Sequence, residues 1–495
     1  MMTIDDRRRY RWLEMFPGLM AWSTLLLAVV LSFIMPLAAM IFIVLFDLLW
    51  LIRVVYVMIF TIAAYRQYRL AQQLDWRAKR QQHVDWPSIV HLIFLPTYGE
   101  SLEVLSSTLT SLARVDYPAD RFYVILAIEE REGEVAQQKA KALQAQFADK
   151  FGYFFISQHP GNIAGEIAGK GSNIAWAGRQ IKSIIDQRGL PYKNILVSTF
   201  DADSNVHPQY FNALTATFLS HPRRWRTSYQ PIPVFHNNIW TSFSFMRVVA
   251  YSTTFWLLGE TLRPDRLLTF SSHSMPWQAL VDVNFWQNDI VSEDSRIFLQ
   301  CFVHYDGDYS VQPIFLPISM DTVHGGTLWR SLTNQYKQIR RWAYGVENFP
   351  YMVWNFLPNP KIPRWRKWQL IWNQFEGTYS WSTAAILIFI LGWLPFHVPS
   401  VVKSSSLLAL NAPVLLQIMM GLAMVGLITS AAISSLMLPP RPVRISAGKH
   451  LMMLLQWVLL PVTMIAFGSL PALEAQTRLM LGKYMGFWVT EKKRQ

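Results

Sequence analysis

The chain has 495 residues, of which 52% are hydrophobic and only 16% are charged, and its formal net charge is +13. This balance is too apolar for an ordinary soluble enzyme and predicts a membrane protein with a sizeable water-facing part. The positive charge suits nucleic acid, anionic lipid or phosphorylated substrates. No basic low-complexity tract or RNA-binding signature accompanies it, which favours lipid and phosphate over nucleic acid. The single cysteine, Cys301, excludes an intramolecular disulfide and a Cys-rich metal site.

The first part of the chain predicts a basic segment followed by a membrane hairpin. Residues 1–17 carry a cluster of arginines, and the apolar stretch 18–64 that follows goes on too long for a cleavable signal peptide. Two spans of about 20 residues each fit this stretch, near 18–35 and 38–60. Basic residues lie on both flanks, so the positive-inside rule places both flanks, and the region that follows, in the cytoplasm.

Residues 85–348 change to short apolar runs that alternate with amphipathic stretches. The pattern predicts strands at 89–95, 122–128, 153–156 and 195–200, and helices at 102–112, 135–147 and 174–185. Such an alternation predicts a mainly parallel sheet that binds ligands at the carboxyl ends of its strands. We therefore expect an α/β domain inserted between N-terminal and C-terminal membrane helices.

The remaining chain predicts a return to the membrane. Residues 349–377 mix four tryptophans with basic residues and prolines, which is typical of a segment at the membrane interface. Residues 378–470 hold three more apolar spans, and residues 471–495 form a basic tail; the spans lie near 378–396, 412–436 and 451–470. Five spans would place this tail outside, which conflicts with its charge. Either one apolar stretch is re-entrant or wrongly divided, or the positive tail is an exception to the rule.

Two carboxylates, Asp201 and Asp203, directly follow the predicted strand 195–200. Like charges this close raise each other's pKa unless a cation neutralises them. Mg²⁺ or Mn²⁺ is the usual cation for such hard oxygen ligands, and it recruits phosphate oxygens in turn. An isolated pair of this kind is more often a turn than a metal site, so the metal interpretation depends on the rest of the chain.

Polar and charged residues also follow the first two predicted strands and open a later helix. Thr97, Tyr98 and Glu100 end the first strand and Glu129 the second, where they suit contacts to the base and ribose of a nucleotide. The alternative is that the acids cap the next helices. Lys170 stands between two glycines at the start of a helix and offers a point charge for phosphate, although a plain flexible loop has the same pattern.

Two further motifs precede the membrane return. Glu293 and Asp294 form a second acidic pair, which could supply a general base for an acceptor hydroxyl; the alternative is a helix N-terminus with first-turn acids. Gln338 and Arg341 lie three residues apart on one helical face, with Trp342 adjacent. Arginine can clamp a diphosphate and tryptophan can stack on a sugar, whereas a basic helix that only contacts lipid phosphate is the alternative.

Taken in this order, the acidic pairs and the Gln-x-x-Arg-Trp motif resemble the membrane-integrated family 2 glycosyltransferases. These include cellulose, hyaluronan and poly-N-acetylglucosamine synthases and also ceramide glucosyltransferases. The resemblance implies a GT-A (Rossmann-like) domain that uses a nucleotide-diphosphate sugar with inversion. It also implies the roles of individual residues. Asp201 and Asp203 would contact the donor diphosphate and the metal, and Asp294, with its neighbour Glu293, would form the catalytic pair in which Asp294 is the base. The pyrophosphate and acceptor would be held by Gln338, Arg341 and Trp342, and the nucleotide and its phosphates would be surrounded by Thr97, Tyr98, Glu100, Glu129 and Lys170.

The sequence departs from the family pattern in three places. Gly99 stands where the family usually has asparagine, and a glutamate pair at Glu129 replaces the usual aspartates. Residues 271–274 replace the usual glycine-containing acceptor loop, so the acceptor does not carry over from the resemblance. His273, within this loop, is a candidate for lining the acceptor pocket.

The parts fit one reaction, in which a sugar moves from a nucleotide-diphosphate donor, with UDP as the expected nucleotide, to an acceptor at the membrane. Several C-terminal spans after Gln-x-x-Arg-Trp favour a growing polysaccharide as acceptor, made by an enzyme of the bacterial inner (plasma) membrane with a cytoplasmic catalytic domain. The alternative is a single transfer onto a lipid. A transport or scaffold protein with a degenerate domain is disfavoured, because Asp203, Asp294 and Arg341 are all present.

Overall fold

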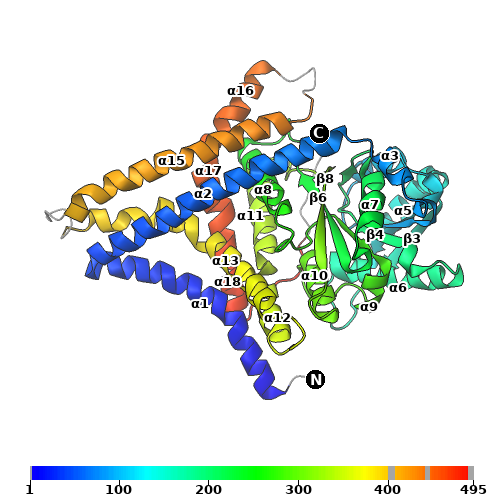
Figure 1. The fold of residues 1–495 in the computed structure, drawn as a ribbon, viewed down its shortest axis with the longest axis horizontal. Helices are drawn as coiled ribbons and strands as arrows, with labels where there is room; N and C mark the ends of the chain where they lie inside the picture. The colour runs from blue at the N-terminus through cyan, green and yellow to red at the C-terminus, as the bar shows by residue number, and fades with distance from the viewer. Residues whose placement is uncertain (1–2, 400–406, 441–445, 489–495) are drawn as a thin grey trace.

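The computed structural model describes residues 3–399, 407–440 and 446–488. An α/β domain lies beside a group of long helices that extend away from it on one side (Figure 1). The strands are β1 (Val90–Pro96), β2 (Phe122–Glu129), β3 (Tyr153–His159), β4 (Ile195–Thr199), β5 (Asn205–Val206), β6 (Thr227–Val234), β7 (His273–Pro276) and β8 (Ser310–Ser319).

Ten helices of the described residues belong to or flank this domain. They are α3 (Trp76–Gln81), α4 (Leu102–Ala113), α5 (Glu134–Phe147), α6 (Lys170–Gln187), α7 (Tyr210–Ser220), α8 (Ser244–Thr261), α9 (Trp277–Asp282), α10 (Glu293–His304), α11 (Leu328–Ala343) and α12 (Asn348–Phe356). The four strands and three helices that the pattern predicts up to residue 200 all form, with bounds that differ by a few residues.

The described strands form one sheet in the order β3-β2-β1-β4-β7-β6-β8-β5. The first four are parallel, as predicted, but β7 pairs antiparallel with β4 and β6, so the sheet is mixed rather than mainly parallel throughout. Strand β1 is buried along its whole length, and its alternate side chains enter two cores: Ile93 and Leu95 on one face, Leu92 and Phe94 on the other. Because the parallel strands end at one edge, the residues after them meet there.

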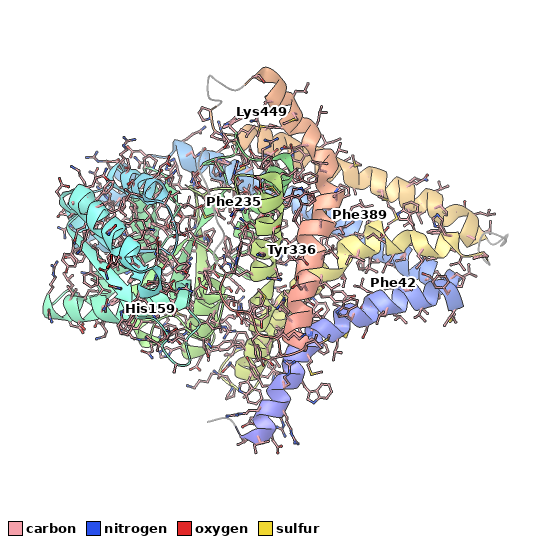
Figure 2. The ribbon with its side chains drawn as sticks, turned by 180° about the vertical axis from the view of Figure 1, so that it is seen from behind. Phe42, His159, Phe235, Tyr336, Phe389 and Lys449 are labelled. Atoms are coloured by element: carbon pink, nitrogen blue, oxygen red, sulfur yellow. The ribbon has the colours of Figure 1, made fainter. Side chains whose placement is uncertain are left out.

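Within the part of the chain that the structure describes, five helical stretches are long and apolar enough to cross a membrane. They are Ile4–Ile34, Pro36–Gln73, Arg364–His397, Ala409–Met437 and Leu451–Met480. The first two stretches are the helices α1 (Ile4–Ile34) and α2 (Pro36–Gln73). The third contains α13 (Arg364–Phe389), and the fourth contains most of α15 (Leu407–Met437). Phe42 and Phe389 mark the part of these helices that lies away from the domain (Figure 2).

The last stretch differs from the others in direction. It is a broken helix of α16 (Ala447–Leu455), α17 (Leu460–Met464), a π-helical turn (Ile465–Ser469) and α18 (Leu470–Met480), and it runs across the base of the long helices (Figure 1). Near its start, Gln456 accepts a hydrogen bond of 2.7 Å from Arg247 of α8. Near its end, Glu474 accepts one of 2.6 Å from Arg340 of α11. Both ends of this stretch therefore stay against the domain.

Candidate functional site

A cavity of about 1580 Å³ opens at the carboxyl ends of β1, β2 and β4 and continues among α2, α8, α13 and α15. Twelve of the thirteen predicted site residues line it: Thr97, Tyr98, Glu100, Glu129, Lys170, Asp201, Asp203, Glu293, Asp294, Gln338, Arg341 and Trp342. Residues far apart in the sequence thus meet at one place, as the sheet topology requires.

The thirteenth residue, His273, is buried in β7 and is not among the residues that line the cavity. Its Nδ1 lies 3.2 Å from the carbonyl oxygen of Ser271, and burial lowers the pKa of His273 to about 4. The structure therefore places a neutral His273 within the sheet and not on the wall of the cavity.

Lys170 begins α6 and points at the acidic pairs. Its Nζ donates a hydrogen bond of 2.7 Å to Oδ1 of Asp201 and lies 4.0 Å from Oε1 of Glu293. Burial opposes the charge on the ammonium, but Asp201, Glu293 and Asp294 outweigh it and raise the pKa of Lys170 above its ordinary value. A permanent cation therefore stands between the two acidic pairs.

Glu293 begins α10 and is nearly fully buried, with 2% of its surface exposed. Burial and the neighbouring Asp294 raise the pKa of Glu293 to about 7, against the opposing effect of Lys170 and Arg341. Its Oε2 has no hydrogen-bond partner within the protein. Asp294 sits one residue further on, with Oδ1 accepting 2.9 Å from the backbone of Ser295. The two acids of this pair therefore have different environments: Glu293 has a carboxylate oxygen without a partner, whereas Oδ1 of Asp294 is held by the backbone of the next residue.

Ser271 joins the two acidic pairs. Its hydroxyl donates a hydrogen bond of 2.7 Å to Oδ2 of Asp201, and its backbone N–H donates one of 2.7 Å to Oδ2 of Asp294. The φ angle of Ser271 is +48°, a left-handed conformation that non-glycine residues rarely adopt. Strained backbone of this kind is found where the surrounding structure holds a residue for function.

Asp203 is more deeply buried than Asp201, with 4% of its surface exposed. Its Oδ2 accepts a hydrogen bond of 2.7 Å from the backbone N–H of Asp321, and its backbone carbonyl accepts one of 2.8 Å from the side-chain amide of Asn237. These bonds fix the turn after β4 and hold the carboxylate at the cavity wall.

The residues after β1 and β2 form a separate corner of the cavity. Oε2 of Glu100 accepts hydrogen bonds from the hydroxyl of Thr97 (2.9 Å) and from the backbone of Tyr98 (2.6 Å). Burial nevertheless raises the pKa of Glu100 to about 7. Arg131 forms an ion pair of 2.5 Å with the buried Glu129 and stacks over the ring of Tyr98 at 3.9 Å. An aromatic face with flanking carboxylates is suited to a base and a ribose.

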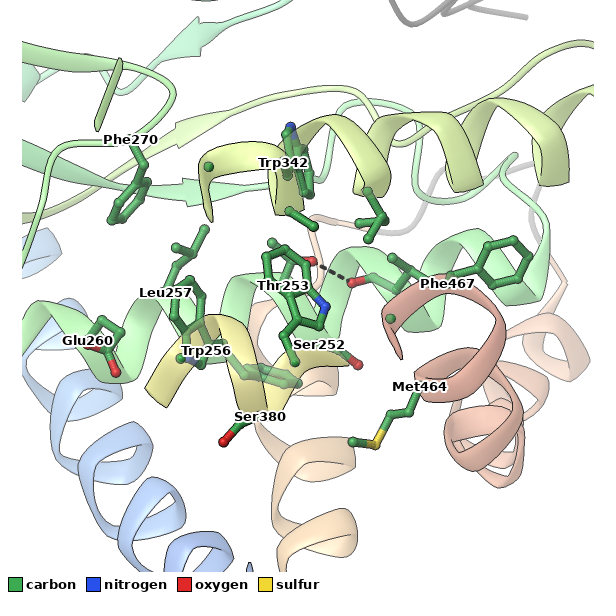
Figure 3. A pocket seen from close by; sticks show the side chains of 18 of the residues that line it. Ser252, Thr253, Trp256, Leu257, Glu260, Phe270, Trp342, Ser380, Met464 and Phe467 are labelled. Carbon is green, nitrogen blue, oxygen red and sulfur yellow. Dashed lines mark hydrogen bonds between the residues drawn. The ribbon is translucent and has the colours of Figure 1, made fainter. Parts of the chain in front are cut away.

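The Gln-x-x-Arg-Trp motif lies on the last turns of α11, facing the same cavity. Gln338 is buried and accepts 3.2 Å from Gln335. The guanidinium of Arg341 lies over the ring of Phe487 at 4.6 Å, and Trp342 packs against Phe235 on the cavity wall. Figure 3 shows Trp342 and Phe270 on one side of the space and Trp256 of α8 opposite.

Three contacts of this site carry no signal in the sequence. Ser271 belongs to the loop expected to hold the acceptor, but its bridge between the acidic pairs depends on its φ angle and on the antiparallel β7. The backbone N–H of Asp321 contributes without its side chain. Phe487 comes from the segment after α18, and a Cβ on Gly169 would lie 2.4 Å from its ring. The alternation of polar and apolar residues predicts none of these three.

The described residues contain no group of three or more His, Cys, Asp or Glu side chains that could hold a metal ion by themselves. The carboxylates of Asp201 and Asp203 supply hard oxygen ligands of the type that Mg²⁺ and Mn²⁺ prefer. Such ions commonly take one or two protein carboxylates and complete their shell with phosphate oxygens and water. The residues present therefore fit a divalent ion that arrives with a phosphorylated substrate.

Comparison with protein families matches residues 196–470 to the model described as "Glycosyl transferase family group 2". The match covers more than half of the chain. This protein belongs to that glycosyltransferase family. The assignment confirms the family and enzyme class predicted from the ordered motifs, and with the mixed α/β sheet and flanking apolar helices it confirms the predicted GT-A fold class.

Two solved structures illustrate the likeness of the fold. The mannosyltransferase PcManGT from Pyrobaculum calidifontis, in complex with GDP-Man and Mn²⁺, is 14% identical over 86% of this chain and 100% of that chain, with a TM-score of 0.42. TarS 1–349 of S. aureus, in complex with UDP-GlcNAc, is 13% identical over 70% of this chain and 91% of that chain, with a TM-score of 0.33. Both TM-scores are below 0.5, so neither likeness adds to the family assignment. A comparison with curated proteins finds no match.

Proposed function

We propose that this glycosyltransferase moves a sugar from a nucleotide-diphosphate donor, with inversion, to a hydroxyl group that reaches the site from the membrane. One observation carries the proposal. The catalytic candidate Asp294, the acidic pair Asp201 and Asp203, and the cations Lys170 and Arg341 line the same cavity, and that cavity continues among the long apolar helices. Donor and acceptor can therefore meet from opposite directions.

Asp294 is the proposed general base. Its Oδ2 and Oδ1 each accept a hydrogen bond from a backbone N–H, that of Ser271 and that of Ser295, and these two bonds fix the orientation of the carboxylate. The acceptor hydroxyl would give its proton to Asp294 as its oxygen attacks the anomeric carbon. Glu293, whose pKa is raised to about 7, is the less suitable base of the pair because it lies buried behind Lys170.

The leaving nucleoside diphosphate would lie toward Lys170 and Arg341. Preorganised cations that face a developing negative charge lower the barrier without reorganising during the reaction. A divalent ion, Mg²⁺ or Mn²⁺, held by Asp203 and Asp201, would supply further charge stabilisation to the diphosphate when bound. Thr97, Tyr98, Glu100 and Glu129 would surround the base and ribose, and UDP is the nucleotide we expect.

Two acceptor classes could use the membrane side of the cavity. One is the end of a growing polysaccharide, which the order of the motifs favours, and the other is a membrane lipid. The two classes require different shapes of the part of the cavity that lies among the long helices. A polymer needs a passage across the membrane, whereas a lipid needs only a space that holds its hydrocarbon chain.

The arrangement of the helices also supports a proposal for topology. The stretch 447–480 contacts the catalytic domain at both its ends, so we propose that it lies along the membrane surface and does not cross. The four remaining helices would then return the basic tail to the side of the catalytic domain. Basic flanks place that side in the cytoplasm, as expected for the bacterial inner membrane.

The experiment that tests the function is release of nucleoside diphosphate by the detergent-purified chain. UDP- and GDP-sugars would be offered one at a time, each with Mg²⁺, Mn²⁺ or a chelator. Metal-dependent release from one donor, lost in Asp203→Ala, is the expected result. Release that persists unchanged in Asp203→Ala would contradict the assignment of the donor site.

A further inference from the structure

We infer that the acceptor is a membrane lipid with an uncharged hydroxyl head, and that its hydrocarbon chain lies in the part of the cavity enclosed by α2, α13 and α15. We call this part the lipid compartment and define it by Ala384, Ala385, Ile388 and Phe389 of α13 together with the residues of α2 and α15 that line the same cavity. The inference rests on the proposed function and names the acceptor of the same site.

The lining of the cavity changes from polar to apolar along α13. Close to the catalytic domain, α13 presents Asn373, Glu376 and Ser380 to the cavity. One and two turns further on, it presents Ala384, Ala385, Ile388 and Phe389. The α15 residues opposite these include Met419, Met420 and Met424. Methionine and other flexible apolar side chains accommodate chains of variable shape. A polar mouth followed by an apolar interior matches a molecule with a polar head and a hydrocarbon tail.

The extent of the compartment matches one leaflet of a bilayer rather than its full thickness. The helical rise from Glu376 to Phe389 is about 20 Å. The hydrocarbon core of a bilayer is about 30 Å thick, so one leaflet contributes about 15 Å. A chain that starts at the mouth can therefore reach the middle of the membrane inside this space.

The far end of the compartment is closed among the described residues. The α2 residues that line the cavity begin at Asp47, and the α15 residues begin at Met419. Beyond them, Met40 of α2 and Ala412 of α15 are buried against each other, and Phe396 packs on the same cluster. A polymer synthase needs a path to the far side at this point, whereas a lipid transferase does not.

The cations along the cavity point to an uncharged head. Arg53 forms an ion pair with Glu376 and also donates a hydrogen bond of 3.3 Å to Ser380. Arg266 forms a second ion pair, in which it donates a hydrogen bond of 2.8 Å to Glu260. Lys170 is paired with Asp201 at the donor site. Among the described cations that line the cavity, Arg341 forms no ion pair with a carboxylate, although its charge acts on Glu293, and we assign it to the donor diphosphate. A lipid phosphate would therefore find each lining cation already engaged, whereas a hydroxyl needs none.

Asp47 is the α2 residue at the far end of the compartment, and it is an acidic residue. It is 7% exposed, its Oδ1 has no hydrogen-bond partner, and it lines the cavity on α2. Asp47→Leu therefore separates the two acceptor classes, because it makes the space more apolar. Transfer to an acceptor with a hydrocarbon chain should become faster, while a glycan that bonded to this carboxylate would lose a contact and react more slowly.

The test uses the full chain in phosphatidylcholine nanodiscs with the labelled donor that supports nucleoside diphosphate release. Dioleoylglycerol is the neutral acceptor probe, and a polyprenyl phosphate is the charged one. Gly421→Phe fills the compartment, because a Cβ at Gly421 of α15 has nothing within 4 Å. Leu422→Phe is the matched control, since the adjacent Leu422 is exposed to lipid and does not line the cavity. Gly377→Phe, at the mouth, where a Cβ also meets nothing within 4 Å, replaces Gly421→Phe should that variant not fold.

The expected product carries one labelled sugar on the diacylglycerol and extracts into organic solvent. Its rate should fall about tenfold or more in Gly421→Phe, stay normal in Leu422→Phe and rise in Asp47→Leu. A water-soluble labelled polymer, or a product made only on the polyprenyl phosphate, overturns the inference while leaving the proposed transferase standing. A diacylglycerol product that Gly421→Phe makes at the normal rate overturns the compartment. No release from any donor would instead refute the proposed function, and this inference with it.

Discussion

Substitution of Ser271 tests whether the bridge between the two acidic pairs supports the reaction. Ser271→Ala removes the hydroxyl that donates 2.7 Å to Asp201 but keeps the backbone N–H that donates 2.7 Å to Asp294. A hydrogen bond to a charged group contributes about 1.5–3 kcal/mol, which corresponds to a loss of about 10- to 150-fold if the bond acts fully in the transition state. Because Asp201 serves the donor, we expect kcat/KM for the donor to fall within this range.

Ser271→Gly is the matched control, since it removes the same hydroxyl but relieves the backbone. At φ +48° a non-glycine residue is strained, so the glycine variant should be more stable than the alanine variant by about 1 kcal/mol. The assay is steady-state release of nucleoside diphosphate with varied donor, beside thermal midpoints in detergent. Both variants should lose similar activity and differ in stability. Wild-type activity in Ser271→Ala would refute the bridge, and equal midpoints would refute the strain.

Two further predictions concern charge and topology. The pKa of Glu293 is raised from 4.5 to about 7, so the folded state loses stability as the pH rises through this interval. Glu293→Gln should therefore stabilise the protein at about pH 8 by up to about 3 kcal/mol and raise its thermal midpoint there, with almost no change at about pH 4; the same gain at both would contradict the burial of this charge. For topology, Lys449→Cys and Lys483→Cys in a Cys301→Ser background should react with an impermeant maleimide from the same side as the control Lys361→Cys. Labelling of Lys483→Cys from the opposite side would show that the stretch 447–480 crosses the membrane.

The sequence predicted the first half of the α/β domain well because each of its strands is a continuous apolar run with a clear end. The later strands were not predicted. Strand β6 contains Pro231 and Pro233, and β8 contains Pro313 and Pro317, residues that argue against a strand in a sequence pattern. In the structure the pairing of β6 with β8 shifts its register between Pro231 and Ile232, so the ladder is irregular where these prolines lie. These strands make the sheet mixed and place β7 behind the site.

The positions of Glu100, Glu129, Asp201 and Asp203 were predictable because these residues lie at or shortly after the ends of strands that must finish at one edge of the sheet. Contacts made by backbone or by remote chain segments were not. Ser271 acts through its φ angle, and Phe487 reaches Arg341 only because α18 returns along the domain. Under the proposed topology, the conflict between five apolar stretches and a basic tail has a physical source as well. Hydropathy reports how apolar a helix is, but it does not report whether both ends of that helix contact the same domain.

In the proposed reaction Asp294 takes the proton from the acceptor while other residues hold the donor. The decisive experiment measures, side by side in wild type and Asp294→Asn, the dissociation constant of the donor and the rate of nucleoside diphosphate release with acceptor present. We expect the donor affinity to be nearly unchanged and the rate to fall by about 10²–10⁴-fold. Release at the wild-type rate in Asp294→Asn, or a loss explained entirely by weaker donor binding, would contradict this role of Asp294.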